Sequence, residues 1–400
     1  MTYLSPLDFP VIRIEDVWAL MRHQITPLKP RRLPLADAGG HVLAEEIIAS
    51  VPLPSFPTAR VDGYAVRVED GPMPRRVVGE QRAGQEPWVQ VGPGEAVWVT
   101  TGAVVPDGAD AVVPVEQVDE EGSGRVRPRG LVTRGMYVRP VGYDVQPGDR
   151  LLSPGVRLRS GEVALLASVG VSKVSVYPRP RVAVLATGDE LQEPGTPLKP
   201  GHIWVGNRYG LLTAARDVGG VPVDMGIVPD TPEVLRSAIR ESVRRADVVI
   251  STGGLSMGDA DWTRDVLAEM GTVYVGRTTA RPVQSAMFVM VEDTPVIALP
   301  GSPVAAWVGF FVLGWPAIRL RAGEQGWSPP RVFVRVPQEV NLGEREAFVP
   351  ARVLYRDGEL WAEMLPRGVR SSVRAQVLLY ISPQFIHTRP GHMVEAWWLP

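Results

Sequence analysis

Residues 247–261 read DVVISTGGLSMGDAD, and this stretch decides the fold. Its first part, residues 248–250, is a short apolar run typical of a buried strand. Three glycines follow, which allow the backbone to turn sharply and to approach a ligand closely: Gly253, Gly254 and Gly258. The pattern predicts a strand that ends in a glycine-rich loop.

A helix is predicted directly after this loop. Asp261 stands at the N-cap position of the helical pattern over residues 262–270. A strand, a glycine loop and a helix start together gather backbone N–H groups near the positive end of the helix, which suits an anion such as phosphate. A tight turn with a capping aspartate explains the same residues equally well.

The same construction occurs twice more in the neighbouring sequence. Residues 181–186 (RVAVLA) form a strand pattern followed by TGDE at 187–190. Residues 295–299 form another, followed by PGSP at 300–303. In an open parallel sheet such loops collect at the carboxyl edge, where ligands bind. The three strand ends therefore predict one ligand site.

Composition narrows the class of protein. The 400 residues contain 42 lysines and arginines against 44 aspartates and glutamates, and this net charge of −2 argues against nucleic acid as a partner. Because there is no cysteine, disulfides, thiolate zinc sites and a cysteine nucleophile are excluded. The five histidines show no metal-ligand spacing, so a metal would sit on oxygen ligands, which favours magnesium.

The chain is expected to be cytoplasmic and to have no membrane segment. No N-terminal segment resembles a signal peptide. The uncharged stretch 295–318 is interrupted by prolines and glycines, so it predicts a buried strand, loop and helix rather than a membrane span.

The N-terminal half is expected to combine short helices with a β-rich region. Residues 14–25 carry apolar side chains at helical spacing, and a second helical pattern lies at 42–48. Valine-rich runs separated by turn residues predict a small β domain within 66–144. Taken alone, Asp62-Gly63 predicts a hairpin turn, and Ser160 predicts the cap of the helix that follows it.

The second half predicts a multidomain α/β plus β architecture. Between about 181 and 322 strand patterns alternate with helical ones, which argues for a doubly wound, mainly parallel sheet. From 329 onward the pattern is again β, sufficient for a small barrel or sandwich, with Asp357-Gly358 as a hairpin turn. The predicted domains are 1–49 with 145–179, a β-rich insert at 50–144, an α/β domain at 180–325 and a C-terminal β domain at 329–400.

Five motifs in this order resemble the MoeA family, the molybdopterin molybdenumtransferases that include the gephyrin E domain. They are DGYA at 62–65, TGA at 101–103, TGDEL at 187–191, GGLSMGDAD at 253–261 and PGSPV at 300–304. The resemblance spans nearly the whole chain. The glycine motif and the later PGSP are specific to molybdopterin-binding domains, and DGYA with its β-rich insert distinguishes MoeA from smaller relatives.

The resemblance implies an elongated homodimer that inserts molybdenum. The reaction would take adenylylated molybdopterin and molybdate and yield molybdenum cofactor and AMP, with Mg²⁺. A molybdopterin adenylyltransferase-type enzyme would be the upstream donor. The site would lie where the α/β domain of one subunit faces the insert of the other, and 1–49 with 145–179 would form the dimerisation and linker domain.

The family match also implies roles for individual residues. The catalytic residues would be Glu190, Asp62, Asp261 and Arg281, and the metal ligands Glu190, Asp259 and Asp261. The substrate-binding residues would be Thr101, Asp144, Thr187, Gly188, Asp230, Gly253, Gly254, Ser256, Gly258, Gln284, Pro300, Gly301 and Ser302. Asp62, Thr101 and Asp144 would come from the partner subunit. From the residues alone, Asp230 and Asp261 are equally well explained as helix caps.

The sequence departs from the family pattern at several positions. The family usually carries KPGKP where this chain has RPVQS at 281–285, so Gln284 stands in place of a cation. Arg281 still supplies positive charge for an oxyanion, with a geometry that differs from that of lysine. Val205 stands where the family has aspartate and Ser302 where it has asparagine, and residues 376–400 follow the family pattern poorly.

Three functional hypotheses follow. A molybdenum insertase is the leading one. A non-catalytic paralogue that binds molybdopterin, or acts as an assembly scaffold, is favoured by the altered segment 281–285. A nucleotide-binding hydrolase would use the same α/β domain and would cleave ordinary nucleotides without any requirement for molybdate.

Overall fold

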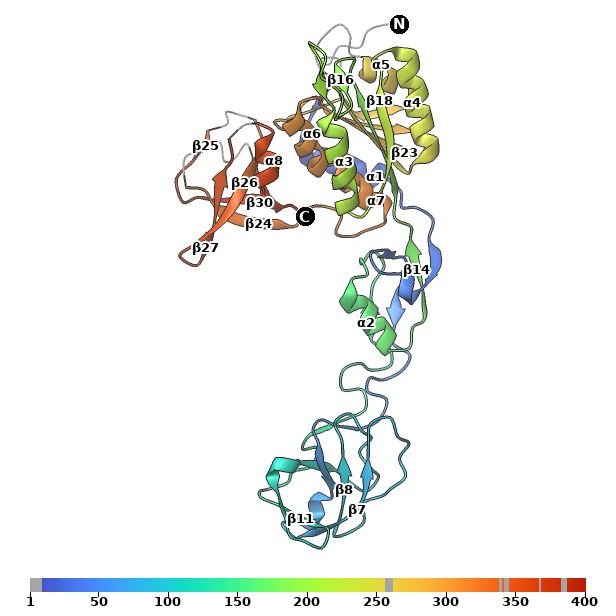
Figure 1. Cartoon of the computed structure of the whole chain (residues 1–400), viewed down its shortest axis with the longest axis vertical. Coiled ribbons are helices and arrows are strands. Elements are labelled where there is room, and N and C mark those ends of the chain that lie inside the picture. Colours follow the sequence, from blue (N-terminus) through green and yellow to red (C-terminus); the bar gives the residue numbers. More distant parts are fainter. Residues whose placement is uncertain (1–8, 256–261, 338–339, 342–344, 367, 383–386) are drawn as a thin grey trace.

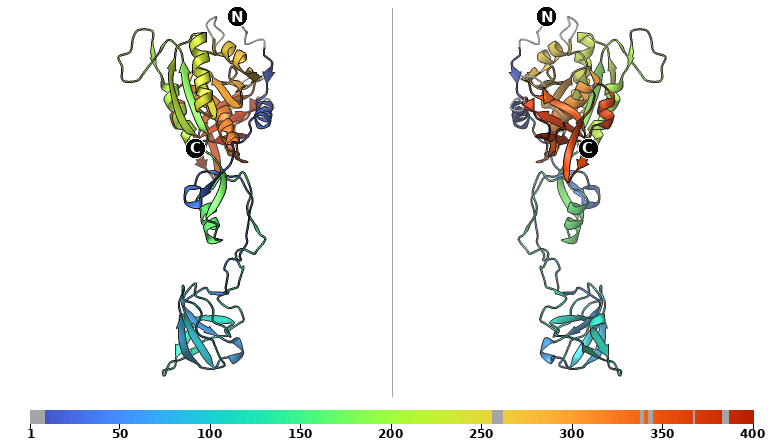
Figure 2. Two further views of the ribbon diagram at one scale, coloured as in Figure 1. Left: turned by 90° about the vertical axis from the view of Figure 1, so that its right-hand side faces the viewer. Right: turned by 90° about the vertical axis from the view of Figure 1, so that its left-hand side faces the viewer.

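The computed structural model describes residues 9–255, 262–337, 340–341, 345–366, 368–382 and 387–400. Figure 1 shows an elongated molecule, with the α/β sheet and the C-terminal barrel at one end and the β-rich insert at the other. A small unit with α2 (Ser160–Ser168) and β14 (Lys173–Tyr177) lies between them. The chain passes twice between this unit and the insert, once outward and once back (Figure 2).

The α/β part is built on a six-stranded sheet with the order β18-β15-β19-β23-β22-β20. The first four strands in this order run parallel. β22 runs antiparallel to them, and β20, which is antiparallel to β22, points the same way as the first four, so the mainly parallel sheet predicted from the sequence is confirmed. The strands are β15 (Arg181–Thr187), β18 (Val221–Val228), β19 (Val248–Thr252), β20 (Thr272–Val275), β22 (Met287–Val291) and β23 (Thr294–Leu299). The central strands are buried along nearly their whole length because helices cover both faces.

The covering helices divide into two groups (Figure 1). One face carries α3 (Gly206–Asp217), α6 (Pro303–Gly309), the π-helical stretch Phe310–Gly314 and α7 (Trp315–Arg321). The other face carries α4 (Pro232–Arg245) and α5 (Trp262–Met270). Two separate apolar cores result, one on each side of the sheet.

The predicted N-terminal helix is present as α1 (Ile14–Gln24), and its apolar face packs into the α/β core. The indole N–H of Trp18 donates to the carbonyl of Val312 at 2.9 Å. Just before the helix, β1 (Val11–Ile12) pairs in parallel with β21 (Arg277–Thr278). This segment therefore takes its core contacts from the α/β part, whereas the sequence grouped it with residues 145–179.

The helix predicted at residues 42–48 is wrong, because this segment forms the short strands β3 (Val42–Leu43) and β4 (Ile47–Ile48). β3 pairs with β14, which also pairs with β2 (Arg31–Pro34), and β4 pairs with β13 (Arg150–Leu152). A short apolar run fits either element, and here the available partner strands decide the outcome.

The start of α2 also differs from the prediction. Ser160 is its first helical residue, and Arg159 occupies the cap position. The carboxylate of Glu162 accepts the backbone N–H of Arg159 at 2.9 Å and so satisfies a donor at the helix start. The acidic residue three positions after the cap, and not the serine hydroxyl, stabilises this end.

The insert contains a six-stranded sheet with the order β10-β11-β7-β8-β6-β9. Its strands are β6 (Gly63–Val66), β7 (Arg75–Gln81), β8 (Glu95–Val99), β9 (Ala111–Pro114), β10 (Val118–Glu120) and β11 (Arg125–Pro128). Nearby, β5 (Thr58–Ala59) pairs with β12 (Val138–Arg139). The hairpin turn predicted for Asp62-Gly63 is wrong, because Gly63 begins β6 between two partner strands. A Cβ on Gly63 would lie 2.1 Å from the carbonyl oxygen of Val113, so close strand approach requires the glycine.

The C-terminal part is a closed barrel with the order β24-β27-β26-β28-β30. Its elements are β24 (Arg331–Arg335), β26 (Ala347–Arg356), β27 (Glu359–Met364), α8 (Arg370–Arg374), β28 (Val377–Ile381) and β30 (Met393–Trp398). A further short pair joins β25 (Val340–Asn341) to β29 (His387–Thr388). The hairpin predicted at Asp357-Gly358 is confirmed, with φ of 51° and 83° at the two turn residues.

Aromatic rings join the barrel to α1. The ring of Trp397 lies 4.8 Å from that of Trp18 and 4.6 Å from that of Phe348, measured between centroids. Phe348 in turn stacks on Tyr380 at 5.2 Å. Trp397 is only 1% exposed, so part of the divergent C-terminal segment serves to dock the barrel.

Among the described residues, one helical stretch, Pro303–Arg321, is long and apolar enough to span a membrane by composition. Most of its side chains lie inside the protein, where they pack on β19 and β23. The prediction of a buried strand, loop and helix in this region is confirmed.

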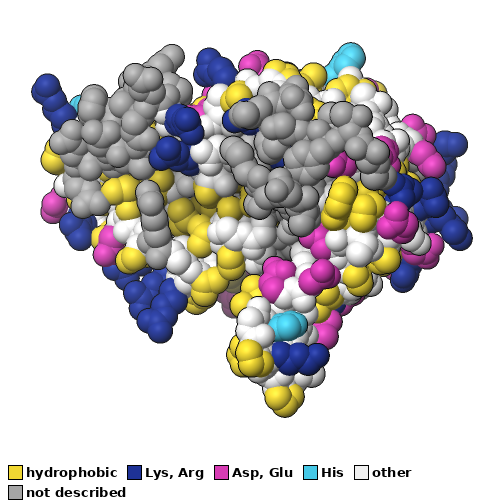
Figure 3. All heavy atoms as spheres, turned by 90° about the horizontal axis from the view of Figure 1, so that it is seen from above, with side chains coloured by type: hydrophobic (Ala, Val, Ile, Leu, Met, Phe, Trp, Pro, Cys, Tyr) yellow, Lys and Arg dark blue, Asp and Glu magenta, His cyan; other side chains and the backbone are white. Residues whose placement is uncertain are grey.

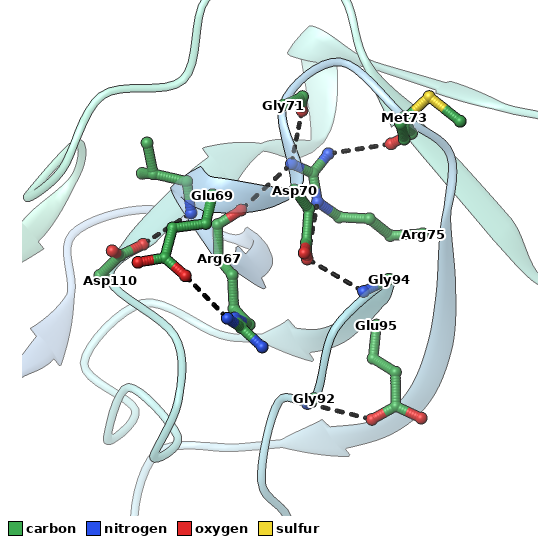
Figure 4. Close-up of polar contacts among 11 residues, drawn as sticks. Arg67, Glu69, Asp70, Gly71, Met73, Arg75, Gly92, Gly94, Glu95 and Asp110 are labelled. Atoms are coloured by element: carbon green, nitrogen blue, oxygen red, sulfur yellow. Dashed lines mark hydrogen bonds and ion pairs between the residues drawn. The ribbon is translucent and has the colours of Figure 1, made fainter.

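A buried arginine organises one corner of the insert (Figure 4). The Arg75 guanidinium is fully buried and donates to the carbonyl oxygens of Met73 at 3.2 Å, Arg67 at 3.2 Å and Gly71 at 2.7 Å. The carboxylate of Asp70 lies 4.0 Å from its Nε. One side chain thus donates to three backbone carbonyls of the turn at residues 67–73.

Replacing Arg75 by methionine is expected to destabilise the insert by about 2–4 kcal/mol, because three backbone carbonyls lose a donor from a side chain that is itself fully buried. The measurement is the unfolding transition of the insert by calorimetry on the full chain. The matched control is Arg76→Met, since Arg76 is exposed and forms a surface ion pair with Glu95 at 2.7 Å. Equal losses in the two variants would contradict the role given to Arg75.

Candidate functional site

A cavity of about 330 Å³ opens at the carboxyl edge of the α/β sheet. Its walls are formed by the ends of β15 and β19, the first turns of α3 and α6, and the parallel strand pair β16 (Leu191–Gln192) and β17 (Ile203–Trp204). Four predicted site residues line it: Thr187, Glu190, Gly253 and Gly301. The three strand ends named from the sequence therefore meet around one cavity.

The loop after β19 approaches the other strand ends so closely that only glycine fits. Gly253 has φ of +103°, and a Cβ there would lie 2.1 Å from the carbonyl oxygen of Thr187. Gly254 has φ of +63°, and its Cβ would lie 2.2 Å from the hydroxyl of Thr263. Backbone rather than side chains therefore faces the cavity here, as a site for an anion requires.

Acidic side chains gather around the end of β15. The hydroxyl of Thr187 lies 3.3 Å from a carboxylate oxygen of Asp230, and the backbone N–H of Asp230 donates to Asp189 at 3.2 Å. The carboxylate of Glu190 folds back over Gly188, where it fills the space that a Cβ would need. Thr231 occupies the N-cap position of α4, so Asp230 lies outside that helix, and the alternative of a simple cap is not supported.

Asn207 ties two of the loops together and was missed by the sequence analysis. Its side-chain amide donates to the hydroxyl of Thr252 at 3.1 Å and to the carbonyl of Gly301 at 2.9 Å. The Thr252 hydroxyl donates onward to the carbonyl of Pro300 at 3.1 Å. Ser302, the remaining residue of this loop, occupies the N-cap position of α6. An amide side chain in the first turn of a helix at the sheet edge was the available signal.

The opposite wall of the cavity is apolar and aromatic. Trp204 comes from β17, Trp307 from α6, and Val369 with Ser372 from the α8 region of the barrel. Trp204 and Val369 are 51% and 59% exposed. Figure 3 shows hydrophobic side chains among the charged ones on this end of the molecule. The contribution of α8 to this wall could not be predicted from the sequence, because α8 lies about 70 residues beyond the last of the sheet loops.

A buried arginine anchors the segment β16–loop–β17 that carries Trp204. Arg208 is 3% exposed and forms ion pairs with Glu193 at 2.8 Å and Asp224 at 3.4 Å, and its guanidinium also lies over the ring of Tyr209. The loop that joins β16 to β17 extends away from the sheet (Figure 2). Arg208 therefore fixes the base of a projecting segment whose tip is exposed.

Three of the predicted residues lie in or beside the insert, far from this cavity along the molecule (Figure 1). Asp62 accepts both the backbone N–H of Thr101 at 2.7 Å and its hydroxyl at 2.8 Å. The backbone hydrogen bond first, and the hydroxyl second, lower the pKa of Asp62 below its usual value. Asp144 faces Arg139 at 3.5 Å, and both side chains are largely exposed.

Arg281 and Gln284 lie in a tight loop that does not line the cavity. The carbonyl of Gln284 accepts the N–H of Thr278 at 3.0 Å. On the barrel side, the N–H of Arg281 donates to the carbonyl of Glu346 at 2.9 Å, and its carbonyl accepts the N–H of Phe348 at 2.8 Å. The Arg281 side chain is exposed.

Ser256, Gly258, Asp259 and Asp261 lie outside the described residues. Within the described ranges, no group of three or more acidic or histidine side chains is placed to hold a metal ion. The oxygen donors beside the cavity, Glu190 and Asp230, are of the type that magnesium prefers. Because their donor atoms are carboxylate oxygens, these two residues suit a hard divalent cation.

Comparison with known proteins places this sheet and its loops among the molybdopterin-binding α/β domains. A family model described as "Probable molybdopterin binding domain" matches residues 183–320, and one described as "MoeA N-terminal region (domain I and II)" matches residues 12–170.

Whole proteins of the same build are similar. The chain is 35% identical over 312 residues to a molybdopterin molybdenumtransferase of Haemophilus influenzae, covering 77% of this chain and 76% of that protein. It is 34% identical over 401 residues to molybdopterin molybdenumtransferase 2 of Mycobacterium tuberculosis, covering 96% and 98%. A crystal structure of a molybdopterin biosynthesis MoeA protein from Pyrococcus horikoshii aligns over 98% of this chain and 100% of that one, with a TM-score of 0.83 at 26% identity. The chain belongs to the MoeA family, the molybdopterin molybdenumtransferases.

Substituting Gly253 by alanine is expected to strain the loop beneath the cavity and to cost about 1–3 kcal/mol of stability. The positive φ and the contact with the Thr187 carbonyl are the physical reasons. Chemical denaturation of the purified chain measures the loss. Gly161→Ala is the control, because a Cβ on Gly161 in α2 meets nothing within 4 Å; an unchanged midpoint for Gly253→Ala would show that the loop relaxes freely.

Proposed function

We propose that this chain is a cytoplasmic enzyme that inserts molybdenum into adenylylated molybdopterin and releases AMP. The observation that carries the proposal is the cavity at the carboxyl edge, in which glycine backbone and carboxylates face an aromatic wall. The curated relatives bear the name of this transferase, which favours the insertase over the non-catalytic and hydrolase alternatives.

The two walls of the cavity suit the two parts of such a substrate. The anhydride phosphates would bind the backbone N–H groups of the Gly253 and Gly301 loops, because these approach the cavity without intervening side chains. A flat heterocycle would lie against Trp204 and Trp307, where apolar area is available on one side. Asn207 would hold the loops of β19 and β23 at a fixed separation and so orient the substrate between them.

Magnesium would be held by Glu190 together with Asp259 and Asp261. When bound, such an ion offsets the phosphate charge that grows as the anhydride breaks. The chain's own part is to keep Glu190 at the cavity wall. The fold of the carboxylate over Gly188 achieves this, since any larger residue at 188 would displace it.

Asp62, Thr101 and Asp144 would complete the site of a second copy of the chain. In one chain the insert lies at the opposite end of the molecule from the cavity (Figure 1). Asp62 is exposed, and its carboxylate, whose pKa is lowered by the hydrogen bonds from Thr101, is available to a partner. A homodimer in which each insert reaches the other cavity uses these residues, and an adenylyltransferase-type donor would supply the substrate.

Molybdate, the anionic co-substrate, would be held with the help of Arg281. The segment 281–285 has lost one family cation at Gln284, so the binding of the oxyanion depends on a single guanidinium there. Hydrogen bonds on both sides of Arg281 to the barrel keep its backbone in place.

Glu190→Ala is expected to reduce molybdate-dependent AMP release from adenylylated molybdopterin by at least about 100-fold, the usual effect of removing a group that acts at a reacting centre. AMP release by the wild-type chain with magnesium, with and without molybdate, is the reference. Glu233→Ala, in an exposed first turn of α4, is the control and should keep wild-type rates.

Two outcomes would overturn this assignment. Pterin binding by the wild-type chain without AMP release would show a non-catalytic binding protein. Equal release with and without molybdate, extending to ordinary nucleotides, would show a hydrolase.

Mixing two inactive variants tests the dimer. Asp62→Ala and Glu190→Ala chains, unfolded and refolded together, would form mixed dimers in which one site keeps both residues. About a quarter of wild-type activity is expected, because about half of the dimers are mixed and half of their sites are intact. Each variant refolded alone is the control, and no recovery in the mixture would place both residues in the site of one chain.

A further inference from the structure

A buried glutamate lies where the barrel meets α1. Glu346, just before β26, is 0% exposed. One carboxyl oxygen accepts the N–H of Ile14 at 3.1 Å and the hydroxyl of Thr279, and the other lies 2.8 Å from the hydroxyl of Tyr380. These partners belong to α1, to the segment before Arg281 and to β28, so one carboxyl joins three parts of the fold.

The same tyrosine hydroxyl also touches a second carboxylate. Tyr380 lies 2.5 Å from Oε1 of Glu15, in the first turn of α1. A tyrosine hydroxyl has one proton and can donate to only one of two carboxylates. The contact between the Tyr380 oxygen and the second carboxyl group then needs a proton from that carboxyl group. Without a proton between them, two oxygen atoms at this distance repel each other. The cluster of Glu15, Tyr380 and Glu346 is therefore complete only with one additional proton.

The surroundings decide which carboxyl carries that proton. Glu15 is 47% exposed and lies 3.5 Å from Arg13, whereas Glu346 is fully buried. Glu346 faces Tyr380, Thr279 and the N-terminus of α1, with Glu15 and Arg13 as the nearby charges. Burial first, and the charge of Glu15 further, raise the pKa of Glu346, while the bonds from Tyr380 and Ile14 and the charge of Arg13 act in the opposite direction. When Glu346 carries the proton, its carboxyl donates to the Tyr380 oxygen and the Tyr380 hydroxyl donates to Glu15; when Glu346 is ionised, it accepts from Tyr380 instead.

The backbone around Glu346 holds the loop of Arg281. The carbonyl of Glu346 and the N–H of Phe348 bind the N–H and the carbonyl of Arg281, and Ala347 pairs with Arg281 in parallel register. Because the side chain of Glu346 also binds Thr279, residues 279 and 281 are both fixed by one residue of the barrel. A change in the position of Glu346 therefore displaces both residue 279 and residue 281 of this loop.

We propose that Glu346, Tyr380 and Glu15 form a proton-holding latch that docks the barrel on α1 and positions the Arg281 loop. Glu346 is a positioning residue and does not touch substrate. The latch itself follows from the described contacts, whereas its effect on molybdate rests on the proposed function.

The pKa of Glu346 is higher in the folded chain than in the unfolded one, and this determines whether the docked barrel gains or loses stability as the pH rises. The stabilising contribution of Glu346 is fully present below the unfolded pKa, about 4.3 for glutamate. It is lost as the pH rises through the raised folded pKa. The barrel is therefore docked most firmly in acid and loosens as Glu346 ionises.

The test is the thermal unfolding of the barrel as a function of pH in the full chain. The wild type is expected to lose several degrees of midpoint across the ionisation of Glu346. Glu346→Gln is expected to remove this step, because an amide mimics the protonated acid: its oxygen accepts from Ile14 and Thr279, and its N–H donates to Tyr380. Infrared absorption of a protonated carboxylic acid should be present in the wild type and lost in Glu346→Gln. Glu363→Gln, at an exposed ion pair of the barrel, is the control.

A second variant guards against misfolding of the first. Glu15→Gln removes a charge that raises the pKa of Glu346, so the step should move to lower pH. An unchanged pH profile in both variants would overturn the latch.

The catalytic readout separates this inference from the proposed function. In the wild type the KM for molybdate should rise with pH through the same step at constant kcat, and in Glu346→Gln it should not. A chain with no insertase activity that still shows the docking step would refute the proposed function and keep the latch. A normal insertase whose molybdate KM follows pH equally in the wild type and in Glu346→Gln would refute the positioning of the Arg281 loop.

Discussion

The parallel pairing of β15, β19 and β23 is the constraint on which the rest of the structure depends. Parallel strands end at the same edge, so three loops that are far apart in the sequence meet around one cavity. The loops can meet only because Gly253 and Gly254 leave no side chain between them and the carbonyl of Thr187. Asn207 then fixes the separation with two hydrogen bonds. The anion-binding geometry is thus a by-product of strand direction and close backbone approach.

Much of this could be predicted from the sequence, because apolar runs and glycine loops report the sheet directly. The predictions were wrong where a local sequence pattern is compatible with more than one kind of secondary structure. The run at 42–48 satisfies helical spacing, yet β13 and β14 offer edges with which to pair. Asp62-Gly63 satisfies the composition of a turn, yet its glycine is required by a neighbouring strand that begins 48 residues later. Neither partner is visible in a local window.

The site was only half predictable for the same reason. The polar wall comes from the ends of the strands, which are recognisable in the sequence because glycine and small or acidic residues follow each apolar run. The aromatic wall comes from the parallel pair β16–β17, from α6 and from the barrel. Nothing in the sequence around Val369 or Ser372 indicates that they face a cavity. The substitution at Val205 becomes intelligible with this wall in place: it is 1% exposed and lines the cavity beside Trp204, so an aliphatic side chain extends the apolar surface there.

The position of α1 in the fold determines when its contacts can form during synthesis of the chain. Its tryptophan bonds to Val312, and its first backbone N–H bonds to Glu346, which are 294 and 332 positions further along the chain. At about 5–20 residues per second, the ribosome needs roughly 15–60 s to make that distance. During this interval the insert and the small unit with α2 are made, while α1 still lacks its hydrogen bonds to Val312 and Glu346. Of the described helices, α1 is thus synthesised first, yet its contacts are complete only when the start of the barrel has been made.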